Sequence, residues 1–164
     1  MEQPGPHGHI IITNHLSSIP ETLDHKRLVS HYISLIVKEL LDRAEKHDNS
    51  KMEPGEVEYF DKLTPMVNSV TYGSDEYKAF LETLRPALAH HYSLNRHHPE
   101  HHKGGIDGMD LVDLVEMLCD WKASTLRQQD GDILASIDKN QSRFKYGDEL
   151  SKILVNTANN KLKD

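Results

Sequence analysis

Apolar residues recur at helical spacing between residues 21 and 46. Leu28, Tyr32, Leu35, Ile36 and Leu40 fall mostly three or four residues apart. This spacing puts the side chains on one face of an α-helix, and a proline stands just before the stretch, where helices commonly start. The pattern predicts a helix over residues 21–46.

Shorter stretches along the chain repeat this pattern. We expect a helix after the turn at residues 53–56, ending at Thr64-Pro65. Another is expected over residues 75–92, with Ser74 as its N-cap and a kink or restart at Pro86. Residues 99–108 are expected to be irregular. Further helices are predicted over residues 110–129, 133–140 and 147–160. No stretch alternates with the period of a β-strand, so the predicted fold is all-α, a single-domain helical bundle.

Residues 1–20 differ from the rest in composition. They contain Pro4, Gly5, Pro6, Gly8 and Pro20, and such a composition favours a flexible N-terminal arm. Residues 21–164 are long enough for one domain around one core. We therefore expect an arm over residues 1–20 and a helical domain over residues 21–164.

Charge and cysteine content exclude several classes of protein. The net charge of -7 gives no overall attraction for nucleic acid. Cys119 is the single cysteine, so an internal disulfide and a thiolate zinc cluster are excluded, and a reducing compartment is expected. No stretch has the roughly 20 apolar residues of a membrane span, and the N-terminus has no secretion signal. The expected location is the cytoplasm.

Histidine is the unusual component, with 12 in the chain. His47 and Asp48 are adjacent at the end of the first predicted helix, and they offer a neutral nitrogen and an anionic oxygen at a fixed separation. A divalent cation that activates water suits such a pair. A second run, residues 89–101, is dense in histidine, and on its helix His91 shares a face with Leu84 and Leu88, so we expect it to point inward.

Acidic residues form a third group, on the helix predicted over residues 110–129. Asp113, Glu116 and Asp120 are spaced three and four residues apart, so their carboxylates share one face, next to the apolar stripe. That stripe is expected to turn five residues inward: Leu111, Leu114, Val115, Leu118 and Trp121. The acids are either solvated or need a cation to relieve their repulsion. We expect Asp120 to bind the metal and Glu116 to orient a histidine ligand.

Together these residues resemble the HD-domain metal-dependent phosphohydrolases. In that superfamily a first His is followed by an apolar residue four positions later, a His-Asp pair by a Lys three later, and a distal Asp lies on a later helix. Here His25 with Val29, His47-Asp48 with Lys51, and Asp120 match the three parts. Over about residues 22–160 the chain looks closest to an uncharacterised family of small phage and bacterial proteins with HD-like features.

The resemblance implies that His25, His47, Asp48 and Asp120 bind one divalent transition metal, Mn, Co, Ni, Fe or Zn. It also implies a condition on the fold. On one unbroken helix His25 and His47 would lie about 33 Å apart at about 1.5 Å per residue. The helix over residues 21–46 must therefore fold back, and residues 34–38 are where we expect the break.

The expected function is hydrolysis of a nucleotide or a related small phosphate ester by metal-activated water. Asp48, Lys51 and Glu56 are the expected catalytic residues, with Glu56 as a proton shuttle. Phosphate binding is assigned to six residues: Lys51, His91, Asn95, Arg96, His97 and His98. The inward histidines could instead complete a second metal site.

Two other functions stay open. One is a non-catalytic helical module that binds a nucleotide or a metal as a sensor or a phage-encoded interaction protein. The other is a di-iron oxygenase of the HD type. The expected partner is a small phosphorylated substrate, with no nucleic acid and no membrane, and the resemblance allows a homo-oligomer.

Overall fold

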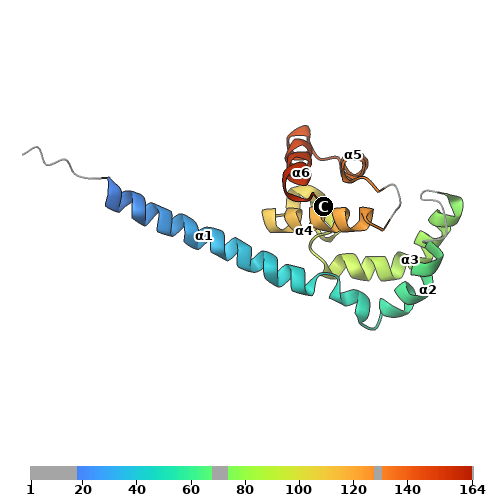
Figure 1. Ribbon diagram of the computed structural model, residues 1–164. Coiled ribbons are helices and arrows are strands. Elements are labelled where there is room, and N and C mark those ends of the chain that lie inside the picture. The colour runs from blue at the N-terminus through green and yellow to red at the C-terminus, as the bar shows by residue number, and fades with distance from the viewer. Residues whose placement is uncertain (1–17, 68–73, 128–130, 164) are drawn as a thin grey trace, which may run out of the picture. The chain divides into compact units, whose positions relative to one another are not determined.

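The structure is a computed structural model that describes residues 18–67, 74–127 and 131–163 (Figure 1). All regular elements in these ranges are helices, which confirms the all-α fold. The residues divide into two compact units, residues 1–37 and residues 38–164. Each unit is described by itself. Most of the arm predicted over residues 1–20 lies outside the described residues.

Helix α1, Ile19–Lys46, supplies the described part of the first unit and the beginning of the second. It starts two residues earlier than predicted and contains no buried residue. Between Ile19 and Val37 its large apolar side chains are 41–65 % exposed. A helix that is apolar around most of its circumference is usually buried against other parts of a protein.

The break predicted in α1 is absent, and this part of the prediction is wrong. The helix runs for 28 residues without interruption, and Ser34 donates a hydrogen bond of 2.8 Å to the carbonyl of Ser30, as a residue within a continuous helix can. Neither Gly nor Pro occurs in residues 34–38, so nothing local opposes helix formation. His25 therefore lies in the first turns of a continuous helix that ends at Lys46, directly before His47.

The remaining helices follow in the second unit. They are η1 Asn49–Met52, α2 Val57–Val67, α3 Asp75–Leu94, η2 Pro99–His101, η3 Gly105–Gly108, α4 Leu111–Thr125, α5 Ile133–Phe144 and α6 Asp148–Lys161. Helix α2 does not end at Thr64-Pro65 as predicted. Pro65 lies in its last turn, where the missing N–H removes only one hydrogen bond. Pro86 lies inside α3, which continues through this residue as one helix.

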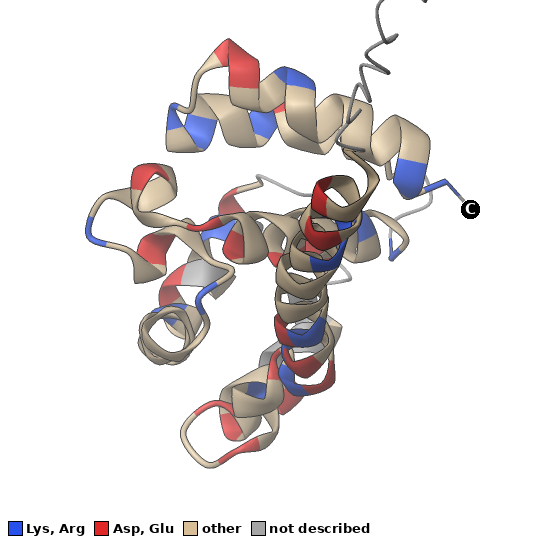
Figure 2. Cartoon of the chain, turned by 90° about the vertical axis from the view of Figure 1, so that its left-hand side faces the viewer, with Lys and Arg blue, Asp and Glu red and all other residues tan. Residues whose placement is uncertain are grey.

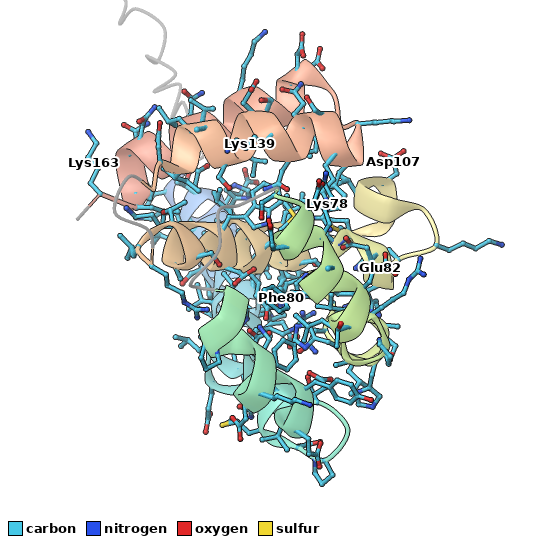
Figure 3. All side chains as sticks on the ribbon, turned by 90° about the vertical axis from the view of Figure 1, so that its right-hand side faces the viewer. Lys78, Phe80, Glu82, Asp107, Lys139 and Lys163 are labelled. Carbon is cyan, nitrogen blue, oxygen red and sulfur yellow. The ribbon has the colours of Figure 1, made fainter. Side chains whose placement is uncertain are left out.

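The apolar core lies between α4, α5 and α6. Its buried members include Met117 and Leu118 of α4, Ile137 of α5 and Leu154 of α6. Figure 1 and Figure 3 show α5 and α6 on one side of α4, and α2 beside α3 on the other. The hydroxyl of Tyr146 donates a 2.7 Å hydrogen bond to the carbonyl of Ile137, so this buried polar group is satisfied.

Helix α4 has two different faces. Leu114, Met117, Leu118 and Trp121 contribute to the core, whereas Leu111 is 72 % exposed and Val115 40 % exposed. The inward stripe predicted for this helix was therefore right for Leu114, Leu118 and Trp121 and wrong for the other two residues. The adjacent face carries the three acids at positions 113, 116 and 120. This face points away from the core and forms one wall of the polar cluster described below.

Figure 2 shows Lys and Arg interspersed with Asp and Glu over the described helices. Among these helices none combines the length and the apolar composition that a membrane span requires.

Candidate metal centre

The candidate site begins where α1 ends. The chain reverses at Asp48, whose backbone is left-handed, with φ at 57°. Asp tolerates this conformation better than most residues, yet it costs about 1–2 kcal/mol relative to the right-handed region. The reversal leads directly into η1, where the amide of Lys51 donates to the carbonyl of Asp48 at 2.9 Å. Local strain thus holds the Asp48 carboxylate between α1 and η1.

The histidine-rich segment supplies the facing wall. His91 lies in the last turns of α3, and His97 and His98 follow before η2. Two further histidines hold this loop in place, since His101 pairs with the Tyr92 carbonyl at 2.9 Å and His102 with the Arg96 carbonyl at 2.8 Å. His101 and His102 therefore have structural roles in this loop.

Six side chains converge between these walls: His47, Asp48, His91, His97, His98 and Asp120. The ring nitrogens Nε2 of His91 and His98 are 2.9 Å apart. Oδ1 of Asp48 lies 3.2 Å from Nε2 of His91 and 3.6 Å from Nε2 of His97. On the other side, Nε2 of His47 is 3.5 Å from Oδ2 of Asp48 and 3.7 Å from Oδ1 of Asp120.

Two buried glutamates hold the opposite nitrogens of these rings. Oε1 of Glu116 is 2.9 Å from Nδ1 of His47 and 3.1 Å from Nδ1 of His97. Oε2 of Glu56 is 2.9 Å from Nδ1 of His91. When Nδ1 donates its proton to a carboxylate, Nε2 of a neutral imidazole is left with its lone pair facing the cluster. This is the usual arrangement around a metal-binding histidine.

An ion-pair network holds the second carboxylate oxygen of Glu116, Oε2. Arg43 donates to Oε2 of Glu116 at 2.9 Å and to Oδ1 of Asp113 at 3.1 Å. Arg96 donates to both oxygens of Asp113, at 3.0 and 2.8 Å. Asp113 is fully buried, and it also accepts from the amide of Asp110 in the capping box that starts α4. The network connects the end of α1, the loop after α3 and the start of α4.

The electrostatics of the cluster are strongly perturbed. The nearby carboxylates of Asp120 and Glu116 raise the pKa of His47 to about 10, against the effect of burial. Burial alone would raise the pKa of Asp48, yet the adjacent His91 ring and the ammonium of Lys51 hold it well below its usual range. Burial and the neighbouring rings of His97 and His91 lower the pKa of His98 to about 3, so this ring is neutral near pH 7. Opposed charges at such short range are typical of functional sites.

The donor set fits a divalent transition metal. Ligand atoms roughly 2.1 Å from one ion lie about 3.0 Å apart at a right angle and about 3.4 Å apart at the tetrahedral angle. The distances of 2.9–3.7 Å between the inward atoms match this spacing. In addition, Oδ1 of Asp48 and Nε2 of His97 are buried without a hydrogen-bond partner among the described residues. Such orphaned atoms are costly unless a ligand satisfies them.

The cluster can be divided into two groups that share Asp48. One consists of Asp48, His91, His97 and His98, and the other of His47, Asp48 and Asp120. His91 and His97 are almost fully buried, whereas the side chains of His47, Asp48 and Asp120 are 20–29 % exposed. The first group is therefore closed, and the second has an edge open to solvent.

Three of the four predicted metal ligands lie together in the structure, namely His47, Asp48 and Asp120. The fourth, His25, is exposed on α1 in the other unit and belongs to no group of possible ligands among the described residues.

Most of the residues that were assigned to phosphate binding lie away from the open edge of the cluster. His91, His97 and His98 lie among the possible metal ligands, as the second metal site considered from the sequence would require. Asn95 donates to the hydroxyl of Ser50 at 2.9 Å, and Arg96 is paired with Asp113. Only Lys51 stays beside the open edge, 2.6 Å from Oδ2 of Asp48.

Glu56 also differs from its prediction as a proton shuttle. It is fully buried, and its oxygens accept hydrogen bonds from Ser50, His90 and His91 at 2.8–3.0 Å. A carboxylate without access to solvent or to the inward face of the cluster is suited to orient His91 instead. No sequence signal marks this role, because Glu56 and His91 are 35 residues apart.

Fold and site together define the chain as an all-α protein with a histidine and carboxylate cluster that is able to hold metal. The family model of unknown function DUF5662 matches residues 14–164. The chain therefore belongs to this family. Neither a curated protein nor a solved structure matches it.

Proposed function

We propose that this protein is a metal-dependent phosphohydrolase that acts on a nucleotide or a related small phosphate ester. The observation that carries the metal is the convergence of six inward donors, two of them buried and unsatisfied. The phosphate substrate comes from the resemblance to HD-domain phosphohydrolases and from the lysine at the open edge. The resemblance itself stays a proposal.

Two ions fit the cluster better than one. The six donors divide into a nitrogen-rich group and an oxygen-rich group, and each oxygen of Asp48 faces one of them. Asp48 would thus be the shared ligand. Two adjacent metal ions are a common solution for hydrolysis of phosphate esters, because they stabilise both the attacking and the leaving oxygen.

The side chains at the open edge have roles that follow from their positions. When bound, a divalent ion supplies Lewis acidity that polarises the phosphoryl group and lowers the pKa of water. Lys51 lies beside Asp48, its side chain 35 % exposed and its ammonium 5.3 Å from the centre of the Phe60 ring. From there it can hold a nonbridging phosphoryl oxygen as a point charge.

The outer carboxylates keep the histidine ring nitrogens oriented toward the cluster during turnover. Glu116 orients His47 and His97, and Glu56 orients His91. Neither glutamate faces the open edge, so we assign both to positioning and not to proton transfer.

The test is hydrolysis of a panel of nucleotides and phosphomonoesters, with phosphate release measured. We expect activity that EDTA abolishes and that added Mn²⁺ or Co²⁺ restores, and we expect Asp48→Ala to remove it. Full activity in metal-free protein would contradict the proposal. So would an Asp48→Ala variant as active as the wild type.

Burial of His91 and His97 favours a second candidate, a non-catalytic module that binds a metal or a nucleotide as a sensor. Structural metal sites are closed and saturated by protein ligands, as the group around these histidines is. Metal binding without turnover of any substrate in the panel would support this candidate over the hydrolase.

Because a nitrogen-rich group lies beside a shared carboxylate, a di-iron oxygenase is also a candidate function. Spectroscopy of iron-loaded protein distinguishes it, because coupled iron ions exposed to oxygen give absorption that a hydrolase loaded with Mn²⁺ or Zn²⁺ lacks.

A further inference from the structure

A cavity of about 150 Å³ lies beside Glu116 and His97, and of the six inward donors only His97 lines it. Its walls come from the end of α1, the end of α3 and the loop that follows, and α4. Seven residues line it: Arg43, Lys46, Leu94, Asn95, Arg96, His97 and Glu116. All of them belong to the second unit. About 10–15 Å³ of such volume is enough to hold one water molecule, so the cavity has room for a phosphate-sized ion.

The charges of this lining are unusual for a chain with a net charge of -7. Three cationic side chains, Arg43, Lys46 and Arg96, line the cavity with a single carboxylate, that of Glu116. Asp113, which pairs with both arginines, is fully buried and is not part of the lining. Cationic side chains therefore outnumber carboxylates in the lining, and beyond it Arg43 also pairs with Glu39 and Arg96 with Asp110.

Hydrogen-bond donors at the cavity are left unused. A guanidinium has five N–H groups, and Arg43 uses three of its own on Glu39, Asp113 and Glu116. Arg96 is similarly occupied only through Nε and one terminal nitrogen, and its side chain is 43 % exposed. The Lys46 side chain is exposed and forms no hydrogen bond or ion pair with any residue that the structure describes.

We propose that this cavity binds a phosphate-sized oxyanion, held by Lys46 and by the remaining N–H groups of Arg43 and Arg96. Guanidinium and ammonium groups that converge on one concave surface are the usual protein partners of phosphate. The binding itself follows from the cavity alone. Only the nature of its ligand in the cell rests on the proposed function: a second anionic group of a phosphorylated substrate whose reacting phosphate lies at the metal cluster.

The test uses full-length protein freed of metal with a chelator, so that a phosphate bound at a metal cannot contribute. Inorganic phosphate is titrated into the protein by calorimetry at constant ionic strength, and AMP is titrated in parallel. Lys46→Gln is the test variant, because Lys46 is exposed and has not been placed in the catalytic machinery. Lys152→Gln is the matched control, since it removes the same charge from an exposed position on α6 that does not line the cavity.

We expect saturable binding of phosphate by the wild type and by Lys152→Gln, weakened about tenfold or more in Lys46→Gln through the loss of one charge-assisted contact. Tighter, Lys46-dependent binding of AMP would identify a phosphate ester as the ligand, and preference for inorganic phosphate would identify the free ion. No saturable binding by the wild type, or equal binding by Lys46→Gln and the wild type, would overturn the proposal. Hydrolysis of the substrate panel by the metal-loaded protein, measured separately, tests the proposed function whatever the phosphate result.

Discussion

Replacing Glu56 by Gln separates the orienting role from the proton-transfer role of this residue. In the structure its oxygens accept hydrogen bonds from Ser50, His90 and His91. The substitution keeps the size of the side chain and removes its charge. It also puts an amide N–H in the place of one acceptor, so one ring N–H in this buried site loses its partner.

The size of the effect follows from these contacts. Removal of a carboxylate that orients a metal-binding histidine typically lowers metal affinity about 10- to 100-fold, which corresponds to about 1.4–2.8 kcal/mol. Glu56 holds one inward histidine, His91, so we expect the lower part of this range, about tenfold to thirtyfold. The unpaired donor should also lower the free energy of unfolding by about 1–3 kcal/mol.

Affinity for Co²⁺ or Zn²⁺ is measured by competition with a chromophoric chelator, and stability by urea unfolding of the metal-free protein. Glu53→Gln is the matched control. It carries the same change on an exposed residue three positions earlier, at the end of η1. This control should bind metal and unfold like the wild type.

The two roles predict different results. An orienting residue changes metal affinity, whereas a proton shuttle changes the turnover of the metal-loaded protein and leaves affinity intact. Wild-type affinity in Glu56→Gln, together with slower turnover at saturating metal, would refute the orienting role.

Three further predictions concern the cluster, its support and the core. His97→Ala should bind one ion fewer per chain than His101→Ala, by elemental analysis, because only His97 is among the inward donors. Burial raises the pKa of Asp113, but hydrogen bonds from Arg96, the Asp110 amide and Arg43 outweigh it and lower this pKa. The stabilisation from Asp113 is therefore present above its ordinary pKa of 3.8. In urea unfolding, the stability difference between wild type and Asp113→Asn should shrink as the pH falls below that value; a constant difference would contradict this. Ile137→Ala should cost about 3 kcal/mol of unfolding free energy and leave metal content unchanged, since Ile137 lies in the core and not in the cluster.

Much of the fold could be predicted because helix periodicity is a local property of the chain. The spacing of apolar residues predicts α4 and α5, and in the structure Asp110 and Asp132 cap their N-termini. The ends of helices were harder to place, as Pro65 shows for α2. The break expected in α1 was inferred from the metal site of another family and not from the local sequence, which favours an unbroken helix.

The candidate site could be predicted in part. An adjacent His-Asp pair, acids on one helix face and an inward His91 are visible in the sequence, and the structure brings them together. What could not be predicted is which element supplies the remaining donors. His97 and His98 take the place that His25 was expected to fill, because the loop after α3 turns back onto the end of α1.

The supporting charges could not be predicted either. Arg43 and Asp113 are 70 residues apart, and no spacing rule connects two residues that meet only through the tertiary fold. Their contact, like that of Glu56 with His91, depends on tertiary structure alone.

The most direct test of the metal centre is the metal content of purified protein before and after loading with Mn²⁺, Co²⁺ or Zn²⁺, for the wild type and for Asp48→Ala. Asp61→Ala, which removes an exposed carboxylate from α2, is the control. We predict one to two tightly bound ions per chain in the wild type and the control, and loss of this binding in Asp48→Ala. A wild-type protein that binds none of these metals, or an Asp48→Ala variant that binds them equally well, would contradict the proposed centre.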